Sequence, residues 1–161
     1  GRAGTAMAAG DAPLRERLRS AAGDRPRILA LVREAEKSLQ DDLPAVSDVY
    51  THAVDVYGEA KGTQDFDYRD LCVKRLRALC RLSPAEAREF HNKLRTCSAG
   101  RADARMYEAR AAMEERLGDV AKAAKMLQEG VRVGAGPSHV LSRALQRLEA
   151  QRPEGDSADS P

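Results

Sequence analysis

The stretch RLGDVAKAAKMLQEGVRVGAGP, residues 116–137, restricts the fold more than any other part of this sequence. Gly118 and Asp119 pair a residue that ends helices with one that caps the start of the next helix. Apolar residues then recur at helical spacing until a Gly-Ala-Gly-Pro run ends the pattern. This stretch therefore predicts a helix between two tight turns, packed antiparallel against the helix before it.

Helical spacing of apolar residues continues along most of the chain. It predicts seven helices, over about residues 28–39, 43–57, 67–80, 84–94, 104–117, 119–133 and 138–148, and no strand. Asp67 is expected to cap the third helix, while Ser83, Pro84 and Glu86 form a capping box that begins the fourth. A break is expected at Ser98–Gly100. Tryptophan is absent and aromatic residues make up only 4% of the chain, which favours small-residue packing in an all-α fold.

The two ends of the sequence differ in composition from the middle. Residues 1–25 are predicted to be disordered, with Leu14 and Leu18 marking a frayed helical lead-in. Met7 is a candidate native start, in which case Gly1–Ala6 precede the natural protein. Residues 152–161 are predicted to form a disordered acidic tail, in which Ser160 before Pro161 resembles a proline-directed phosphorylation site. The folded domain is expected to span residues 26–151.

In the tetratricopeptide pattern the second helix of each unit carries a small residue, a large one four positions later, and a small one three positions after that, and this spacing recurs in several of the predicted helices. It is carried by Ala123, Leu127 and Gly130, by Ala87, His91 and Leu94, and by Val46, Tyr50 and Ala53, with Tyr107, Ala111, Gly118 and Pro137 completing the last unit. The copies lie about 36 and 41 residues apart, close to the ~34-residue period of tetratricopeptide repeats. We therefore predict a right-handed superhelix of about three divergent tetratricopeptide hairpins, plus a C-terminal capping helix.

Composition excludes several classes of function. The net charge of +2 comes from 27 basic and 25 acidic residues, a balance too even, with too few aromatic residues, for a nucleic-acid-binding domain. No run approaches the roughly 20 apolar residues of a membrane span, and no hydrophobic signal core begins the sequence. We therefore expect a protein of the cytoplasm and nucleus that binds neither nucleic acid nor membrane.

Catalytic and metal-binding motifs are missing from the sequence. Phosphate-binding glycine loops, the G-x-S-x-G nucleophile motif and the signatures of a protein kinase are all absent. Cys72, Cys80 and Cys97 are odd in number and lack metal-binding spacing, so neither a disulfide framework nor a zinc site is indicated. We expect a chain that is not an enzyme and that uses no cofactor and no metal.

The repeat segments resemble the N-terminal tetratricopeptide domain of the monopolar spindle kinases, the dual-specificity kinases of the spindle checkpoint. The likeness is greatest in LGDVAKAAKMLQEGVRVGAGP and SRALQRL, where that family has a glycine-containing turn, a lysine-rich helix, a proline-containing stop and a capping helix. SPAEAREF with LRTC resembles the preceding repeat, and LALVREAEKSL matches more loosely. The likeness covers about residues 27–151.

The resemblance implies a noncatalytic targeting module, attached to a dual-specificity protein kinase in the full-length protein. Such a module contributes to kinetochore localisation in mitosis, to self-association as a homodimer and to regulation of the kinase, with kinetochore or other proteins as partners. The alternative is an adaptor of the Bub family, or another tetratricopeptide adaptor, that binds a helical peptide of a scaffold protein. The tryptophan-rich early helix of the Bub family has no counterpart, because this chain contains no tryptophan.

Basic residues on the middle repeat and around its edges provide the candidate partner contacts. We select Arg69, Arg77, Arg88, Arg95 and Arg101. Together they could present positive charge to an acidic segment of a partner. The competing interpretation is a solvated helix face in which carboxylates are mixed with the arginines.

Overall fold

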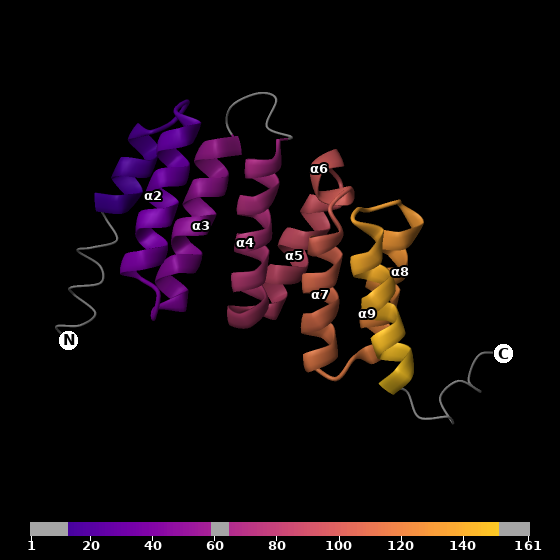
Figure 1. The fold of residues 1–161 in the computed structure, drawn as a ribbon. Coiled ribbons are helices and arrows are strands. Elements are labelled where there is room, and N and C mark those ends of the chain that lie inside the picture. The colour runs from indigo at the N-terminus through magenta and orange to yellow at the C-terminus, as the bar shows by residue number, and fades with distance from the viewer. Residues whose placement is uncertain (1–12, 59–64, 152–161) are drawn as a thin grey trace. The chain divides into compact units, whose positions relative to one another are not determined.

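The computed structural model describes residues 13–58 and 65–151. All of the regular secondary-structure elements in these ranges are helices (Figure 1). The only β-type pairing within these ranges is a single bridge between Asp103 and Gly136. The predicted all-α class is therefore confirmed for the described residues, whereas the right-handed superhelix stays a prediction. Met7 and Ser160, which the sequence analysis singled out, lie outside the described residues.

The chain divides into two compact units, with the boundary between Pro84 and Ala85. The first unit contains a helix over residues 13–20, then α2 (Arg25–Ser38), α3 (Leu43–Gly58) and α4 (Phe66–Leu82). The helix α3 packs against both α2 and α4. The core of the first unit is mainly aliphatic, with Leu18, Ile28, Leu31, Leu71 and Leu76 fully buried, and it also contains the buried Tyr57 ring.

The first unit begins earlier than the sequence predicted. Residues 13–25 were assigned to a disordered segment, but residues 13–20 are helical and the side chains of Leu14 and Leu18 are buried. Two leucines four positions apart form an apolar stripe on one helix face, which packs into the core. Arg15 pairs with Asp48 and Arg17 pairs with Glu34, so this helix is also tied to α3 and α2 by ion pairs.

The N-terminal cap of α4 is Asp65, not Asp67 as predicted. The Asp65 carboxylate accepts a hydrogen bond from the backbone N–H of Tyr68 at 2.8 Å, which satisfies one of the open donors of the first turn. It also accepts a hydrogen bond from the Tyr57 hydroxyl at 3.1 Å and pairs with the Arg25 guanidinium at 3.0 Å. One carboxylate therefore joins α2, α3 and the start of α4.

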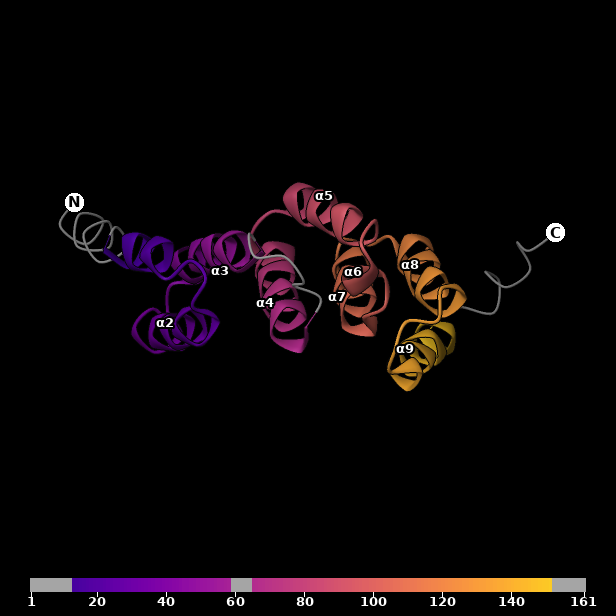
Figure 2. The same cartoon turned by 90° about the horizontal axis from the view of Figure 1, so that it is seen from above.

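The second unit contains α5 (Pro84–Leu94), α6 (Ser98–Arg101), α7 (Ala104–Arg116), α8 (Val120–Arg132) and α9 (Ser138–Gln151). Figure 2 shows α7, α8 and α9 close to end on, with α8 packed against both of its neighbours. Pro84 is the first residue of α5, as predicted. The predicted cap of α8 is also confirmed, because the Asp119 side chain accepts from the backbone N–H of Lys122 at 2.9 Å.

A short helix, α6, occupies the place where a break was predicted. Its glycine, Gly100, packs on the end of α5 so closely that a Cβ atom would lie 2.1 Å from the Leu94 carbonyl oxygen. Glycine is thus required here by contact with backbone, and not by an unusual φ angle. The glycine-containing segment forms one tight helical turn that leads directly into α7.

Small residues dominate the core between α7, α8 and α9. This core consists of Ala104, Tyr107, Ala111, Ala123, Leu127, Ala135, Leu141, Ala144 and Leu148. Gly130 of α8 lies against it, and a Cβ atom there would be 2.8 Å from Leu141 Cδ1 and 2.9 Å from Tyr107 Cγ. The alanine and glycine positions thus let the three helices pack at short range.

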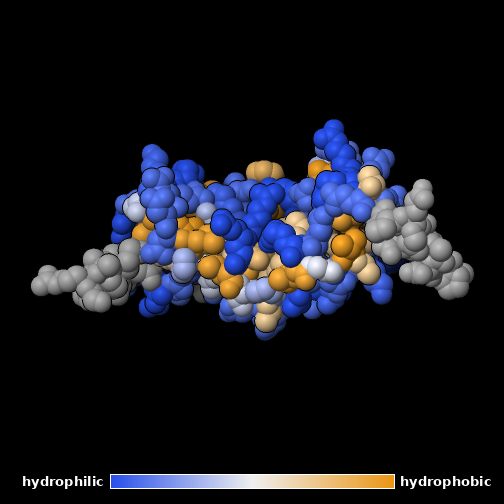
Figure 3. All heavy atoms as spheres, turned by 90° about the horizontal axis from the view of Figure 1, so that it is seen from below, coloured by the Kyte–Doolittle hydropathy of each residue, from blue (hydrophilic) through white to orange (hydrophobic). Residues whose placement is uncertain are grey.

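The surface of the described residues carries scattered apolar side chains. Figure 3 shows one face, on which apolar patches lie among hydrophilic residues. The exposed large hydrophobic residues are Phe66, Leu82, Leu117, Val120 and Val131. Within the described residues, no helix combines the length and the apolar character that a membrane span requires.

Candidate partner-binding groove

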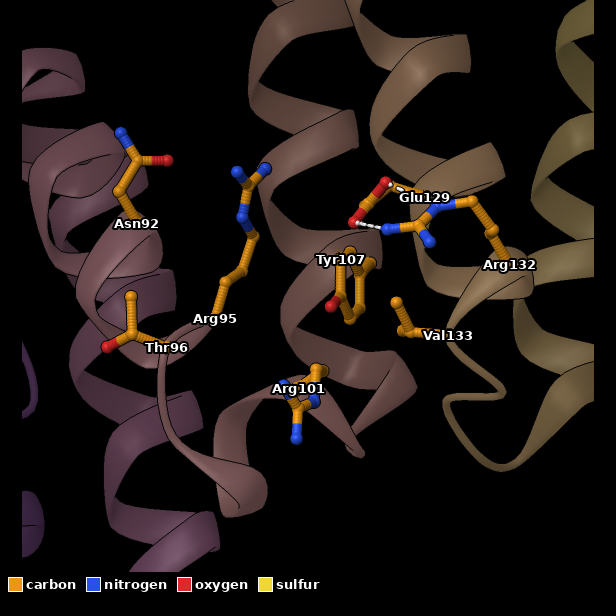
Figure 4. A pocket seen from close by; sticks show the side chains of 8 residues that line it. All are labelled: Asn92, Arg95, Thr96, Arg101, Tyr107, Glu129, Arg132 and Val133. Carbon is orange, nitrogen blue, oxygen red and sulfur yellow. Dashed lines mark hydrogen bonds and ion pairs between the residues drawn. The ribbon is translucent and has the colours of Figure 1, made fainter.

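A groove of about 430 Å³ opens on the surface of the second unit (Figure 4). One wall comes from Asn92 on α5 and from Arg95 and Thr96, which follow the last residue of that helix. Arg101, the last residue of α6, extends this wall. The wall is polar throughout, and two of its four side chains carry positive charge.

The floor and the opposite wall come from α7 and the end of α8. Tyr107 of α7 lies between Arg95 on one side and Arg132 on the other, with its hydroxyl directed toward the side of Arg95 and Arg101 (Figure 4). Glu129 and Arg132 belong to the last turn of α8, and Val133 follows them. Residues from four helices or their ends thus surround one open space.

The charge of the groove is positive, because three arginines face a single carboxylate. Glu129 accepts two hydrogen bonds from Arg132, the shorter at 2.6 Å, and this pairing lowers the pKa of Glu129. Within the described residues, the one hydrogen bond from the Arg95 side chain goes to the Met126 sulfur, a weak acceptor, at 3.7 Å. Among the described residues, neither Arg95 nor Arg101 forms an ion pair with a carboxylate. Two guanidinium groups therefore remain available to an anionic ligand.

Tyr107 adds an unused hydrogen-bonding group at the floor. The residue is 99% buried, at 1% relative exposure, yet its hydroxyl makes no hydrogen bond to any described residue. Burial, together with the nearby Glu129 carboxylate, raises the pKa of Tyr107, so the phenol is protonated at neutral pH. The hydroxyl faces the open groove (Figure 4), where it can donate a hydrogen bond to a ligand oxygen.

A buried charged network links α5 and α7 and reaches the groove floor through the contact between His91 and Tyr107. Glu114 of α7 accepts two hydrogen bonds of 2.9 Å from Arg88 of α5 and one of 2.7 Å from Arg110, four positions earlier on its own helix. The hydrogen bonds from Arg88, joined by the one from Arg110, lower the pKa of Glu114 to about 2. The carboxylate is thus charged and doubly paired at neutral pH, and it fixes α5 against α7.

His91 completes this network as a neutral side chain. Burial, followed by the positive charges of Arg110 and Arg95, lowers the pKa of His91 to about 3. Arg110 Nη1 lies 3.2 Å from His91 Nδ1, and since arginine only donates, Nδ1 is the acceptor and Nε2 carries the proton. The imidazole meets the Tyr107 ring edge to face, with centroids 5.3 Å apart, and so supports the groove floor.

The structure gives different surroundings to the five predicted contact arginines. Arg95 and Arg101 line the groove, whereas Arg88 is held by Glu114 in the buried charged network. Arg69 and Arg77 lie on α4 in the first unit, where Arg77 is exposed and the Arg69 Nε atom is buried without a hydrogen-bond partner. The five arginines therefore do not all belong to one binding site, because two of them lie in the first unit and only two line the groove of the second unit.

Arg132 is the groove arginine that sequence reasoning missed. The repeat pattern does not single it out, because aligning Ala87 with Ala123 places the uncharged Thr96, which was not a predicted contact, opposite Arg132. Both of those residues line the groove. Arg132 lies at the end of α8, outside the middle repeat to which the predicted contact arginines belong.

Most of the residues chosen for repeat packing are buried. Tyr50 is half-buried and donates from its hydroxyl to Glu36 at 2.6 Å, and Gly118 and Pro137 are exposed in turns, where Gly118 has a φ of 91°. Ten positions are buried: Val46, Ala53, Ala87, His91, Leu94, Tyr107, Ala111, Ala123, Leu127 and Gly130. The pattern thus identifies helix-packing positions.

Comparison with known proteins does not identify a family for this chain, so a functional assignment depends on its own sequence and structure. No family model matches the sequence, and no curated protein matches it. Within the described ranges, no cluster of three or more His, Cys, Asp and Glu side chains is placed to hold a metal ion. The arginine-lined groove is therefore the site on which a functional proposal rests.

Proposed function

We propose that this chain is a noncatalytic protein-interaction module and that its groove receives an acidic segment of a partner protein. The observation that carries the proposal is the placement of Arg95 and Arg101 beside the Tyr107 hydroxyl, with no carboxylate paired to either arginine among the described residues. Guanidinium groups in this state are suited to forked hydrogen bonds with the carboxylate or phosphate oxygens of a ligand.

The helical hairpin supports assignment of the module to the tetratricopeptide type. Ala123, Leu127 and Gly130 follow the repeat spacing and are all buried, and α8 packs against both α7 and α9. Repeats of this type bury their apolar faces by stacking on neighbours and leave surfaces that bind other proteins. We propose that α9 is the capping helix of this arrangement.

For the biological setting, we propose the targeting domain of a spindle-assembly-checkpoint kinase, active at kinetochores in mitosis. The support is the likeness of residues 116–148 to the corresponding segment of the monopolar spindle kinases. Self-association and regulation of an attached kinase belong to the same proposal. An adaptor of the Bub family, or another tetratricopeptide adaptor, remains the alternative.

The experiment is localisation of residues 1–161 as a fluorescent fusion in dividing cells. We expect the fusion to accumulate at kinetochores before anaphase and to leave them afterwards, while the fluorescent protein alone stays diffuse. Circular dichroism of the purified fusion verifies that the helices are folded. A diffuse signal from a folded fusion would contradict the kinetochore assignment and favour a general adaptor.

A further inference from the structure

We propose that the groove binds a phosphoserine or phosphothreonine side chain of a partner protein, held by Arg95, Arg101 and Arg132 and by the Tyr107 hydroxyl. The inference rests on the proposed function, because it specifies the partner chemistry of a protein-interaction module. Four side chains from α6, α7, α8 and the residue following α5 converge on it.

The charge balance favours a phosphate over a carboxylate. Three arginines and Glu129 give the lining a net charge of +2, and a phosphorylated side chain carries about −1.5 to −2 at neutral pH. A single carboxylate would neutralise only half of this charge. A phosphate also brings three acceptor oxygens, which matches three guanidinium groups better than the two oxygens of a carboxylate do.

Arg132 is free to change partners when a ligand arrives. Its side chain is 70% exposed and its bond to Glu129 lies at the surface, where an ion pair contributes little to stability. In the part of the chain that the structure describes, Arg95 has only the Met126 sulfur as acceptor, and Arg101 is exposed at the end of α6. Binding therefore requires little loss of existing interactions.

The Tyr107 hydroxyl supports the phosphate site independently of the arginine charges. Its ring is fixed by packing on His91 and against Gly130, yet its hydroxyl has no partner among the described residues. A rigid phenol at the floor donates to a phosphate oxygen with little loss of side-chain entropy. This hydroxyl contributes nothing to the helix packing, so its purpose is separable from folding.

The size and the lining of the groove favour a residue of a protein chain over a free ion. The space of about 430 Å³ exceeds the volume of a phosphate group, and Asn92, Thr96 and Val133 supply polar and apolar surface beside the arginines. Such mixed surface suits a peptide backbone and the neighbouring side chains. Nucleic acid is disfavoured, because the one aromatic ring in the groove is buried and presents no face for a base to stack on.

The test measures fluorescence polarisation with a labelled degenerate peptide library that has phosphoserine fixed at its centre. Matched libraries carry serine or glutamate at that position, and the protein is the full 161-residue chain. We expect the phosphoserine library to bind at least about tenfold more tightly than either control, as for a charge-assisted contact. Equal binding of the phosphoserine and glutamate libraries, or of the phosphoserine and serine libraries, would overturn the proposal.

Variants locate the binding to the groove. We expect Arg95→Gln, Arg101→Gln and Arg132→Gln each to weaken phosphoserine binding, and Arg143→Gln, at an exposed arginine of α9, to leave it unchanged. Tyr107→Phe should weaken binding about 3–10-fold, the effect of one hydrogen bond, with no loss of thermal stability. Unchanged phosphoserine affinity in all four groove variants would also overturn the proposal.

The failure of this inference is distinguishable from failure of the proposed function. If the phosphoserine library does not bind but the fusion still accumulates at kinetochores, the module targets a partner by another chemistry and only the phosphate site is wrong. If the fusion is diffuse and the library still binds, the phosphate site stands and the kinetochore assignment is wrong. Inorganic phosphate serves as competitor, and its failure to displace the library would contradict a phosphate-centred contact.

Discussion

Gly130 on α8 lies so close to Tyr107 on α7 that a Cβ atom at position 130 would be 2.9 Å from Tyr107 Cγ. The same Cβ atom would be 2.8 Å from Leu141 Cδ1 on α9, so three helices meet at this glycine. Tyr107 is also the floor of the arginine-lined groove. The packing of the hairpin and the position of the groove floor therefore depend on the same residue.

Gly130→Ala is expected to destabilise the chain by up to roughly 2 kcal/mol. Overpacking costs roughly 1–3 kcal/mol, and the better helix propensity of alanine recovers about 1 kcal/mol of that loss. Urea unfolding followed by circular dichroism measures the change. The control is Gln128→Ala on the exposed face of α8, which should change stability by less than about 0.5 kcal/mol. Equal stability of the two variants would contradict the close packing.

Glu114→Gln is expected to cost roughly 3–5 kcal/mol, because it leaves the buried Arg110 guanidinium without its counter-charge. The neighbouring Glu115 provides the matched control. Glu115 pairs with a half-exposed Arg147 at the surface, so Glu115→Gln should cost at most about 1 kcal/mol. A similar loss for both variants would show that the network between α5 and α7 is not a buried ionic one.

His91 is expected to make stability depend on pH in the mildly acidic range. Burial, with Arg110 and Arg95 nearby, lowers the pKa of the folded His91 from 6.5 to about 3, so the unfolded chain binds the proton first as the pH falls. This contribution is complete above pH 6.5 and is lost progressively between pH 6.5 and 3, with a slope of up to about 1.4 kcal/mol per pH unit.

The variant His91→Gln tests this titration. Glutamine retains a neutral acceptor for Arg110 but does not bind a proton, so the slope between pH 6.5 and 4.5 should decrease. Below pH 4.5, Glu114 adds its own loss, because its pKa is lowered from 4.5 to about 2. The measurement is the unfolding free energy of the wild-type protein and of the His91→Gln variant across pH 4.5–7. Identical slopes for the two proteins would exclude His91 as the source of the pH dependence.

Asp65→Ala is expected to destabilise the first unit by more than the roughly 1 kcal/mol of a lost helix cap. The reason is that Asp65 also accepts from Tyr57 and pairs with Arg25. Asp67→Ala, two residues away on an exposed position of α4, should have little effect. Thermal unfolding of the two variants measures the difference, and a larger loss for the Asp67 variant would reverse the assignment of the cap.

Helix positions were predictable because their signals are local. The Gly118-Asp119 turn, the proline at the start of α5 and the spacing of Ala123, Leu127 and Gly130 each act within a few residues, and each predicted the structure as found. The choice between Asp65 and Asp67 was not predictable in this way. It depends on Tyr57 and Arg25, which reach the same carboxylate from other helices.

The groove was only partly predictable, for a similar reason. Arg95 and Arg101 were found by counting basic residues, but the same count included Arg88, whose partner Glu114 lies 26 positions away. Sequence spacing does not distinguish an arginine held by a buried carboxylate from one that faces solvent. The role of Tyr107 was likewise half predicted: its ring belongs to the core, as expected, and its hydroxyl faces the groove.

The most direct test of the central claim is the kinetochore signal of a groove variant in which Arg95, Arg101 and Arg132 are all replaced by glutamate. The matched control replaces three exposed arginines outside the groove, Arg19, Arg33 and Arg143, in the same way. Both fusions are first shown by circular dichroism to retain wild-type helicity and melting temperature. We predict that the groove variant loses the early-mitotic kinetochore signal while the control keeps it. Equal signal from the two variants would contradict the assignment of the groove as the partner-binding site.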